Sequence, residues 1–378
     1  MIRAHMASQN LRTPGPTPLP PAVREALARD MVAHRGPEFA AVLRDCLEGL
    51  KWAYQTEHDM VILTASGSGG LESLVANTLS PGQKLLAVSI GYFGDRLAAI
   101  ARAFGVEVIP VRIDDGQAAD PEAIAQRLKA ESDIDTVFVT HNETSTGVLN
   151  PVREIAQAVR QVRPDVLFLV DGISSVGSVP IEPEGWGCDV VVAGSQKGWM
   201  IPPGLTFVSI SARAWERHKR ATLPRVYFDW QLHKKAAADG STPWTPAVGL
   251  FFALQAALRM MRAEGLEQIF QRHVRFGQFT RDSLADLDMR LLADPRYASP
   301  TVTTAYLPEG TDSKALLRAL HERHDVVLAG GQGRLDGKIV RIGHLGWVVE
   351  DDVAEAIRAL RIELNSARTQ RSPAAARH

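Results

Sequence analysis

Short apolar runs alternate with amphipathic stretches along roughly the first two-thirds of the chain. Runs of this length that are rich in Val, Ile and Leu predict buried parallel strands, and the amphipathic stretches between them predict helices. The expected strands are Met60–Thr64, Lys84–Ser89, Val106–Val111, Thr136–Thr140, Val166–Val170 and Val190–Ala193. This alternation predicts an α/β fold in which a mostly parallel sheet is sandwiched by helices.

Beyond Phe251 the pattern changes to two successive long helices that end near Leu287, followed by a smaller α+β unit. The strands expected in this unit are Thr301–Tyr306, Val326–Leu328 and Ile339–Ile342, and the closing helix is Asp351–Leu364. The prolines before Ala22 predict an extended arm. We therefore expect an arm over 1–21, a large domain over 22–265, a small C-terminal domain over 266–365 and a disordered tail over 366–378.

Composition removes several classes of function. The formal net charge of −1 gives no electrostatic reason to expect a nucleic acid or a membrane as partner. No apolar stretch approaches the ~20 residues of a membrane span, and the N-terminus lacks the apolar region of a signal peptide. The two cysteines form neither a disulfide framework nor a metal motif, and no second ligand stands at metal spacing from His141. We expect a cytoplasmic protein without a metal.

A carboxylate and an amine follow two of the predicted strands. Asp171 comes directly after Val166–Val170, and Lys197 follows Val190–Ala193. The carboxyl ends of parallel strands are where open α/β sheets place their chemistry. Pyridoxal phosphate needs a lysine that holds its aldehyde as a Schiff base and an acid that keeps its ring nitrogen protonated. The alternative is that Lys197 is one more solvated lysine.

Ser68, Gly69 and Gly70 lie between a predicted strand and a predicted helix. Glycines there let backbone N–H groups approach an anion, and the N-terminus of the helix adds partial positive charge. The pattern is not GxGxxG, so a small phosphorylated cofactor is favoured over a dinucleotide. A plain tight turn between strand and helix is the alternative.

Three further features add candidate contacts. Tyr92 and Phe93 follow a strand, where an aromatic ring can stack on a flat heterocycle or can simply pack under a loop. The loop 141–147 is dense in hydrogen-bonding side chains that could reach a ring oxygen. Arg341 interrupts an apolar strand, and its guanidinium matches either a substrate carboxylate or an internal acidic partner.

With these residues assembled, the chain resembles the class V aminotransferases of the pyridoxal-phosphate fold-type I superfamily. The resemblance is closest to the alanine–glyoxylate / serine–glyoxylate aminotransferase branch and extends from Thr13 to about Leu364. The matching segments are Ser66–Gly69, Gly91–Arg96, His141–Gly147, Val170–Ser175, Gly194–Lys197 and Val340–His344.

The resemblance implies a role for each candidate residue. Lys197 is the Schiff-base lysine and Asp171 the partner of the pyridinium nitrogen. The phosphate is held by Ser68, Gly69 and Gln196 with Gly70 in the same turn, Phe93 stacks on the ring, and Thr144 or Ser145 bonds near the ring hydroxyl. Gly15 and Arg341 form the site of the substrate carboxylate. Thr242 and Thr245 reach the phosphate of the other subunit, so a homodimer with shared active sites is implied.

The implied activity is transfer of an amino group from alanine or serine to glyoxylate or pyruvate by a ping-pong mechanism. One departure bears on the substrate: Gly70 stands where the best-known animal members carry a histidine. Other amino donors of the same branch, 2-aminoethylphosphonate or ureidoglycine, stay open. A lyase or cysteine desulfurase is disfavoured, because neither Cys46 nor Cys188 lies in a mobile loop. The alternative from another class of function is a protein that binds the cofactor but catalyses no reaction.

Overall fold

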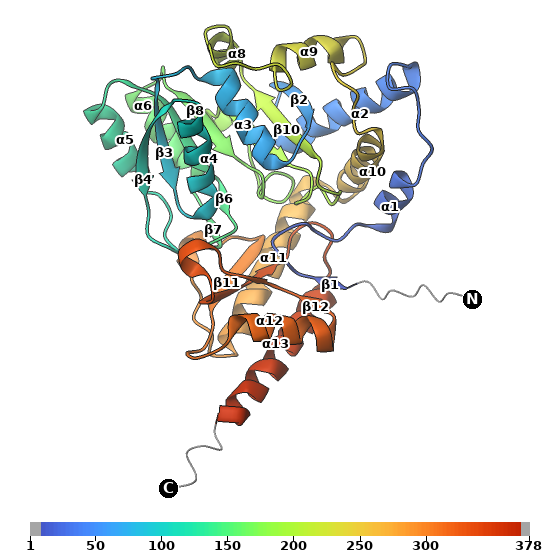
Figure 1. Cartoon of the computed structure of the whole chain (residues 1–378), viewed down its shortest axis with the longest axis vertical. Coiled ribbons are helices and arrows are strands. Elements are labelled where there is room, and N and C mark those ends of the chain that lie inside the picture. The colour runs from blue at the N-terminus through green and yellow to red at the C-terminus, as the bar shows by residue number, and fades with distance from the viewer. Residues whose placement is uncertain (1–8, 372–378) are drawn as a thin grey trace.

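The computed structural model describes residues 9–371, and a seven-stranded sheet forms the centre of its larger part (Figure 1). The strand order is β2-β10-β9-β8-β5-β3-β4. The strands are β2 (Asp59–Thr64), β3 (Lys84–Ser89), β4 (Glu107–Arg112), β5 (Ile134–Thr140), β8 (Leu167–Asp171), β9 (Val190–Gly194) and β10 (Leu205–Ile210). All run parallel except β10, which is antiparallel to both of its neighbours. The predicted mostly parallel sheet is confirmed.

Strand β10 is the element of this sheet that the sequence did not predict. Its polar residues Thr206 and Ser209 interrupt the apolar pattern, yet every residue of the strand is buried. Thr206 satisfies its hydroxyl by donating a hydrogen bond to the carbonyl oxygen of Ala193, at 2.7 Å. A buried hydroxyl costs little once it has such a partner, so the strand tolerates it.

Helices cover both faces of the sheet, as expected. One face packs against α1 (Pro21–Leu27), α2 (Pro37–Tyr54), α5 (Pro121–Ala130), α6 (Val152–Val162) and α10 (Val248–Glu264). The other packs against α3 (Gly67–Thr78), α4 (Tyr92–Ala103), α8 (Ala212–His218) and α9 (Trp230–Ala238). Strand β9 shows why both faces are apolar: Val191 and Ala193 lie in the first cluster, and Val190 and Val192 in the second. The short helix α7 (Pro183–Trp186) precedes β9, and the hairpin β6 (Asn142–Glu143)–β7 (Val148–Leu149) follows β5.

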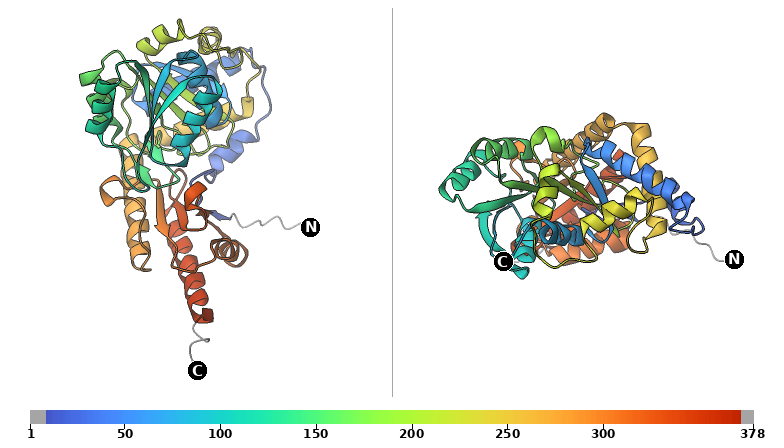
Figure 2. Two further views of the ribbon diagram at one scale, coloured as in Figure 1. Left: turned by 60° about the vertical axis from the view of Figure 1, so that its left-hand side comes forward. Right: turned by 90° about the horizontal axis from the view of Figure 1, so that it is seen from above.

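The C-terminal part lies below the large sheet in Figure 1 and beneath it again in the left view of Figure 2. Its antiparallel sheet has the order β11-β14-β13. The elements are α11 (Leu266–Ala285), η1 (Pro295–Tyr297), β11 (Val302–Tyr306), α12 (Ser313–His324), β12 (Val326–Val327), β13 (Ala329–Gly330), η2 (Gly333–Leu335), β14 (Ile339–Gly343) and α13 (Glu350–Arg371). A separate apolar cluster joins α11, β11, α12, β12, β14 and α13. Gly265 separates α10 from α11, and the domain boundary at 265/266 stays a prediction.

Near both ends of the described chain, the structure has regular elements where the sequence predicted an extended arm and a disordered tail. The arm forms β1 (Asn10–Leu11), which pairs in parallel with β12 of the small domain. Helix α13 continues to Arg371, so residues 366–371 are helical where a disordered tail was expected. The rest of that tail, 372–378, and the first part of the arm, 1–8, lie outside the described residues. Within 9–371, no helix is long and apolar enough to cross a membrane.

Candidate active site

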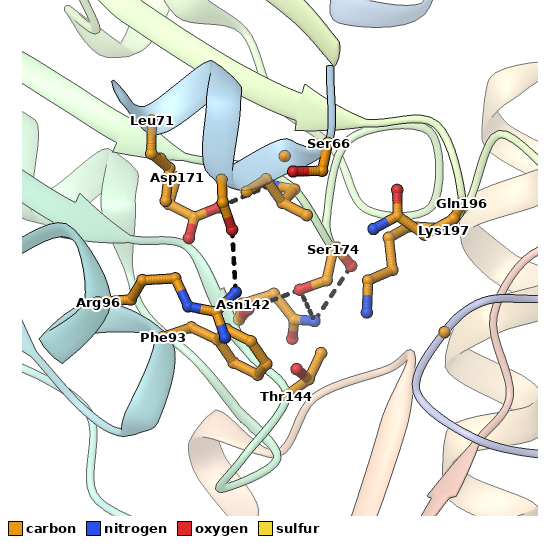
Figure 3. Close-up of a pocket in the computed structure, with 14 residues that line it drawn as sticks. Ser66, Leu71, Phe93, Arg96, Asn142, Thr144, Asp171, Ser174, Gln196 and Lys197 are labelled. Atoms are coloured by element: carbon orange, nitrogen blue, oxygen red, sulfur yellow. Dashed lines mark hydrogen bonds between the residues drawn. The ribbon is translucent and has the colours of Figure 1, made fainter. Parts of the chain in front are cut away.

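A cavity of about 270 Å³ lies at the carboxyl ends of the parallel strands, where the segments that follow β2, β3, β5, β8 and β9 meet (Figure 3). This volume is close to the lower limit of ~300 Å³ for ligand pockets, so the cavity suits a small molecule. It is lined by Gly15, Ser66, Gly67, Ser68, Leu71, Phe93, Arg96, Asn142, Thr144, Asp171, Ile173, Ser174, Gln196 and Lys197. Lys197 and Asp171, which the sequence suggested as one site, both line this cavity.

Lys197 extends into the cavity from the loop after β9, with 9% of its surface exposed. Its Nζ donates a hydrogen bond to the carbonyl oxygen of Pro14 in the N-terminal arm. The pKa of Lys197 is lowered to about 8, mainly by burial. The nearby positive charge of Arg341 also lowers this pKa, and its effect is larger than the opposite effect of the negative charge of Asp171. An amine with this pKa exchanges a proton readily near neutral pH.

Asp171 ends β8 on the same cavity and is 4% exposed. Its carboxylate accepts a hydrogen bond from the backbone N–H of Ile173 at 2.9 Å. Burial raises the pKa of Asp171 to about 7. Among residues 9–371 no cation pairs with this carboxylate within 4.0 Å, so a cationic ligand atom in the cavity would stabilise its ionised form.

The first turn of α3 forms another wall. Ser66 precedes the helix but makes no capping hydrogen bond with its side chain, so it leaves the first amides of α3 to other acceptors. The Ser68 hydroxyl accepts a hydrogen bond from Nη1 of Arg96 at 3.0 Å. Gln196 adds a buried Oε1 that has no hydrogen-bond partner among the described residues. The amides of α3 and the Arg96 guanidinium make this corner of the cavity favourable for an anion, whereas the Gln196 Oε1 is an acceptor that needs a donor.

Gly69 and Gly70 are not among the residues that line the cavity. A Cβ on Gly70 would collide with the Thr206 hydroxyl and lie 2.7 Å from Val192. This glycine therefore allows α3 to pack closely on β9 and β10. This packing explains why a glycine stands at position 70, where the best-known animal members of the branch carry a histidine.

Phe93 supplies the aromatic wall from the first turn of α4. The guanidinium of Arg96 lies 4.8 Å from the centre of the Phe93 ring, close enough for a cation–π contact. Tyr92 contacts Phe93 edge-on but is 43% exposed and lines a neighbouring cavity instead. Of the two aromatic candidates, Phe93 is the one that faces the Lys197 cavity.

The polar loop after β5 divides its side chains between two tasks. Thr144 faces the cavity, whereas Ser145 turns away: its hydroxyl donates to Glu143 at 2.7 Å and accepts from the Tyr92 N–H at 2.9 Å. The buried Glu143 also accepts from the backbone N–H groups of Phe93 and Gly94, at 3.0 and 3.1 Å. Much of the polarity in this loop therefore fixes the start of α4, and of the two residues suggested to bond near the ring hydroxyl only Thr144 lines the cavity.

Arg341 on β14 is 6% exposed and is not among the residues that line the cavity, although it donates to the backbone of Thr144, which does line it. Its Nε donates to the carbonyl oxygen of Gly330 at 2.7 Å, and its Nη1 donates to the carbonyl oxygen of Thr144 and to Oε1 of Gln332, both at 3.2 Å. No acidic residue in the described part of the chain forms an ion pair with it. The internal salt bridge that the sequence left open is not formed.

Thr242 and Thr245 do not line the cavity of their own chain. The Thr242 hydroxyl donates to the carbonyl oxygen of Trp244 at 2.7 Å, and Thr245 is exposed. Within 9–371 no three His, Cys, Asp or Glu side chains gather as a metal site. His141 is buried and meets Trp186 edge-on, and burial lowers its pKa to about 4.

Sequence reasoning assigned no role to three polar residues of the cavity: Ser66, Arg96 and Ser174. Asn142 belongs to the polar loop from which a hydroxyl or amide was expected to reach a ring oxygen. It donates to the Ser174 hydroxyl at 3.0 Å, and its own Oδ1 is buried without a partner among the described residues. Arg96 had a detectable signal, because it stands three positions after Phe93 and so shares its face of the predicted helix. Ser66 and Ser174 had none beyond their places after two strands.

Comparison with known proteins places this geometry in a family. The family model described as Aminotransferase class-V matches residues 14–336. The soluble hydrogenase 42 kDa subunit of Anabaena cylindrica is 42% identical over 94% of this chain and 92% of its own length. The serine–glyoxylate aminotransferase of Methylorubrum extorquens is 34% identical over 94% and 90%. The structure of the alanine–glyoxylate aminotransferase of Nostoc sp. superposes with a TM-score of 0.91 at 31% identity, covering 96% of this chain and 97% of that one.

Enzymes of this family depend on pyridoxal phosphate, and the residues of the cavity fit that cofactor. A buried amine, Lys197, and a buried unpaired carboxylate, Asp171, share the cavity with the aromatic ring of Phe93. The free amides of α3 and the unpartnered Oε1 of Gln196 mark a polar corner beside them. The fold is that of the fold-type I enzymes, and the substrates of the family are amino acids and 2-oxo acids. The chain belongs to the class V aminotransferases and is a pyridoxal-phosphate-dependent enzyme.

Proposed function

We propose that this enzyme transfers the amino group of alanine or serine to glyoxylate or pyruvate in two half-reactions with ping-pong kinetics. The observation that carries the proposal is one small buried cavity that holds the amine of Lys197 and the carboxylate of Asp171, and whose wall residue Thr144 accepts a hydrogen bond from the guanidinium of Arg341. The names of the two aminotransferase relatives, which pair serine or alanine with glyoxylate, support these substrates. We do not extend the hydrogenase name to this chain, because the cavity offers the groups of a transaminase.

Lys197 performs the proton transfers. Its pKa of about 8 lets a substantial fraction of the amine be neutral near pH 8, so it can take the proton from the α-carbon of the amino acid and return one. The bound cofactor supplies the electron sink that makes this carbon acidic. Asp171 holds the proton at the ring nitrogen, because a buried carboxylate favours a cation at hydrogen-bonding distance.

The remaining residues bind and orient. Ser68, Gln196 and the amides at the start of α3 hold the phosphate, with Arg96 beside Ser68. When the cofactor is bound, Phe93 would supply an aromatic surface for its ring and Thr144 would offer a hydrogen bond near the ring hydroxyl. Arg341 binds the carboxylate shared by every α-amino acid and 2-oxo acid substrate, since its planar guanidinium matches a carboxylate in two parallel hydrogen bonds.

We propose that the active unit is a homodimer in which Thr242 and Thr245 reach the phosphate of the partner subunit. Both lie away from the cavity of their own chain, and Thr245 is exposed. Cys46 and Cys188 are free and buried, which supports a reducing, cytoplasmic location. Burial also raises the pKa of both thiols, so neither supplies the reactive thiolate of a desulfurase.

A single-turnover experiment tests the substrates. The purified pyridoxal-phosphate enzyme is mixed with one amino acid in the absence of an acceptor. Alanine and serine should each release about one equivalent of 2-oxo acid per site with loss of the cofactor's visible absorbance. Steady-state rates with glyoxylate or pyruvate should then give parallel double-reciprocal lines. Faster turnover of 2-aminoethylphosphonate or ureidoglycine than of either amino acid would replace the proposed donors.

A further inference from the structure

We propose that Gln332 is a positioning residue that orients Arg341 for the substrate carboxylate while leaving its positive charge unpaired. The inference rests on the proposed role of Arg341 and adds to it the means by which the guanidinium is held. Gln332 lies in the segment between β13 and η2.

The acceptors around Arg341 are all neutral. They are the carbonyl oxygens of Gly330 and Thr144 and the amide oxygen of Gln332, at 2.7, 3.2 and 3.2 Å. Two of these are backbone atoms, so Gln332 is the one side chain among them. Three neutral acceptors fix the guanidinium plane and satisfy part of its donors, but they contribute no negative charge that a substrate would have to displace.

Burial lowers the pKa of Arg341 and the negative charge of the buried Glu143 opposes this shift, but Glu143 forms its hydrogen bonds with other groups. Its oxygens accept hydrogen bonds from the backbone of Phe93, Gly94 and Ser145 and from the Ser145 hydroxyl. No ion pair joins it to Arg341 among the described residues. A buried arginine that lacks a carboxylate partner is costly to the fold, and an incoming carboxylate offsets that cost.

The backbone around Gln332 is held firmly enough to aim its side chain. A Cβ on Gly331 would collide with the carbonyl oxygen of Leu335, so the chain is tightly turned there. The Leu335 N–H donates to the carbonyl oxygen of Gln332 at 3.1 Å. Arg334, two positions on, forms an ion pair with Asp115 of the large domain at 2.7 Å. Gln332 also lines a cavity of about 230 Å³ between η2 and the start of α4, so a polar group at this position is tolerated.

The test replaces the neutral amide by a carboxylate of the same size. In Gln332→Glu the new carboxylate can pair with Arg341 and compete with the substrate, so KM for the amino acid and for the 2-oxo acid should both rise roughly ten- to hundredfold with kcat within about threefold of the parent. Gln332→Leu, which removes the acceptor without adding charge, should raise KM less. Gln268→Glu adds the same charge at an exposed position of α11 and should change neither constant.

The pH dependence separates a charge effect from a packing defect. Lowering the pH protonates the introduced carboxyl group, so the KM ratio of Gln332→Glu to the parent should shrink, whereas the ratio for Gln332→Leu should stay constant. Pyridoxal-phosphate absorbance and the Tm of each variant verify that the protein is folded and loaded. An unchanged KM in Gln332→Glu, or a KM ratio that does not respond to pH, overturns the inference. If Arg341→Ala also leaves KM unchanged, the proposed carboxylate site itself fails; a raised KM in Arg341→Ala alone rejects only the role of Gln332.

Discussion

Gly15 lies directly against the side chain of Lys197: a Cβ on Gly15 would stand 2.6 Å from Nζ and 2.7 Å from Cδ of the lysine. Its φ of +128° is also one that L side chains rarely adopt. The N-terminal arm is therefore part of the active site, and its close approach depends on the absence of a side chain at this position.

Gly15→Ala should reduce kcat/KM by roughly a hundredfold or more, because the added methyl group displaces Lys197 from its position. The matched control is Gly82→Ala, which also has a positive φ, +78°, but has no atom within 4 Å of the added Cβ. That variant should lose about 1–2 kcal/mol of unfolding free energy and keep normal kinetics. Steady-state assays and thermal melts compare the two. Equal kinetics for both variants would show that the arm does not constrain Lys197.

Asp171 makes the stability of the cofactor-free protein depend on pH. Its pKa is raised from 3.8 to about 7, so between these values the folded state binds a proton that the unfolded chain has released. The stability that this group contributes is present at low pH and is lost as the pH rises toward 7, by roughly 2–4 kcal/mol in total. Asp171→Asn should remove the loss, so the Tm of the variant should exceed that of the parent far more at pH 8 than at pH 5.

Arg96 should serve the phosphate of the cofactor, since it donates to Ser68 at the start of α3. Arg96→Met is expected to weaken binding of pyridoxal phosphate about ten- to hundredfold and to leave the affinity for pyridoxal, which lacks the phosphate, almost unchanged. Arg102→Met, an exposed arginine on the same helix, is the control. Fluorescence titration gives both affinities. Equal losses for the two ligands would assign Arg96 to the ring of Phe93 instead.

Shared active sites predict complementation between inactive subunits. Mixing Lys197→Ala with Thr245→Ala under subunit exchange gives hybrid dimers in which one site carries both lesions and the other carries neither. Activity at limiting cofactor should recover to about a quarter of the parent for random assortment. Mixing Lys197→Ala with Asp171→Ala should give no recovery, because both residues line the cavity of one chain. The same absence of recovery in the first mixture, with exchange proven, would mean that each site is built from a single subunit.

Covalent attachment provides the most direct test of the lysine. Borohydride reduction of the loaded enzyme followed by peptide mapping should place the pyridoxyl group on Lys197, the one lysine that lines the cavity. Lys197→Arg should give no reduced adduct and no turnover. An adduct on another lysine would move the active site away from this cavity.

The sequence by itself determined the layered α/β fold and the edge of the sheet where the chemistry lies. Apolar runs such as Val190–Ala193 are buried on both faces, and a polar residue that ends such a strand has to lie at its carboxyl end. This reasoning placed Asp171 and Lys197 in one site, because parallel strands bring their ends to the same edge. It missed β10, where the Thr206 hydroxyl bonds to the backbone of Ala193 and the Ser209 hydroxyl to the ring of His58, so that polar residues occur in a buried strand.

The tertiary structure alone decided which polar residues face the cavity. Thr144 and Ser145 are adjacent in sequence, yet only the tightly packed start of α4 directs Ser145 to Glu143 and leaves Thr144 on the cavity. Gly70 is a glycine because of β9 and β10, which are distant in the chain. Arg341 has no acidic partner because the neutral groups around it come from Gly330, Thr144 and Gln332. Each outcome depends on contacts between segments far apart in the sequence, and local pattern carries no information about such contacts.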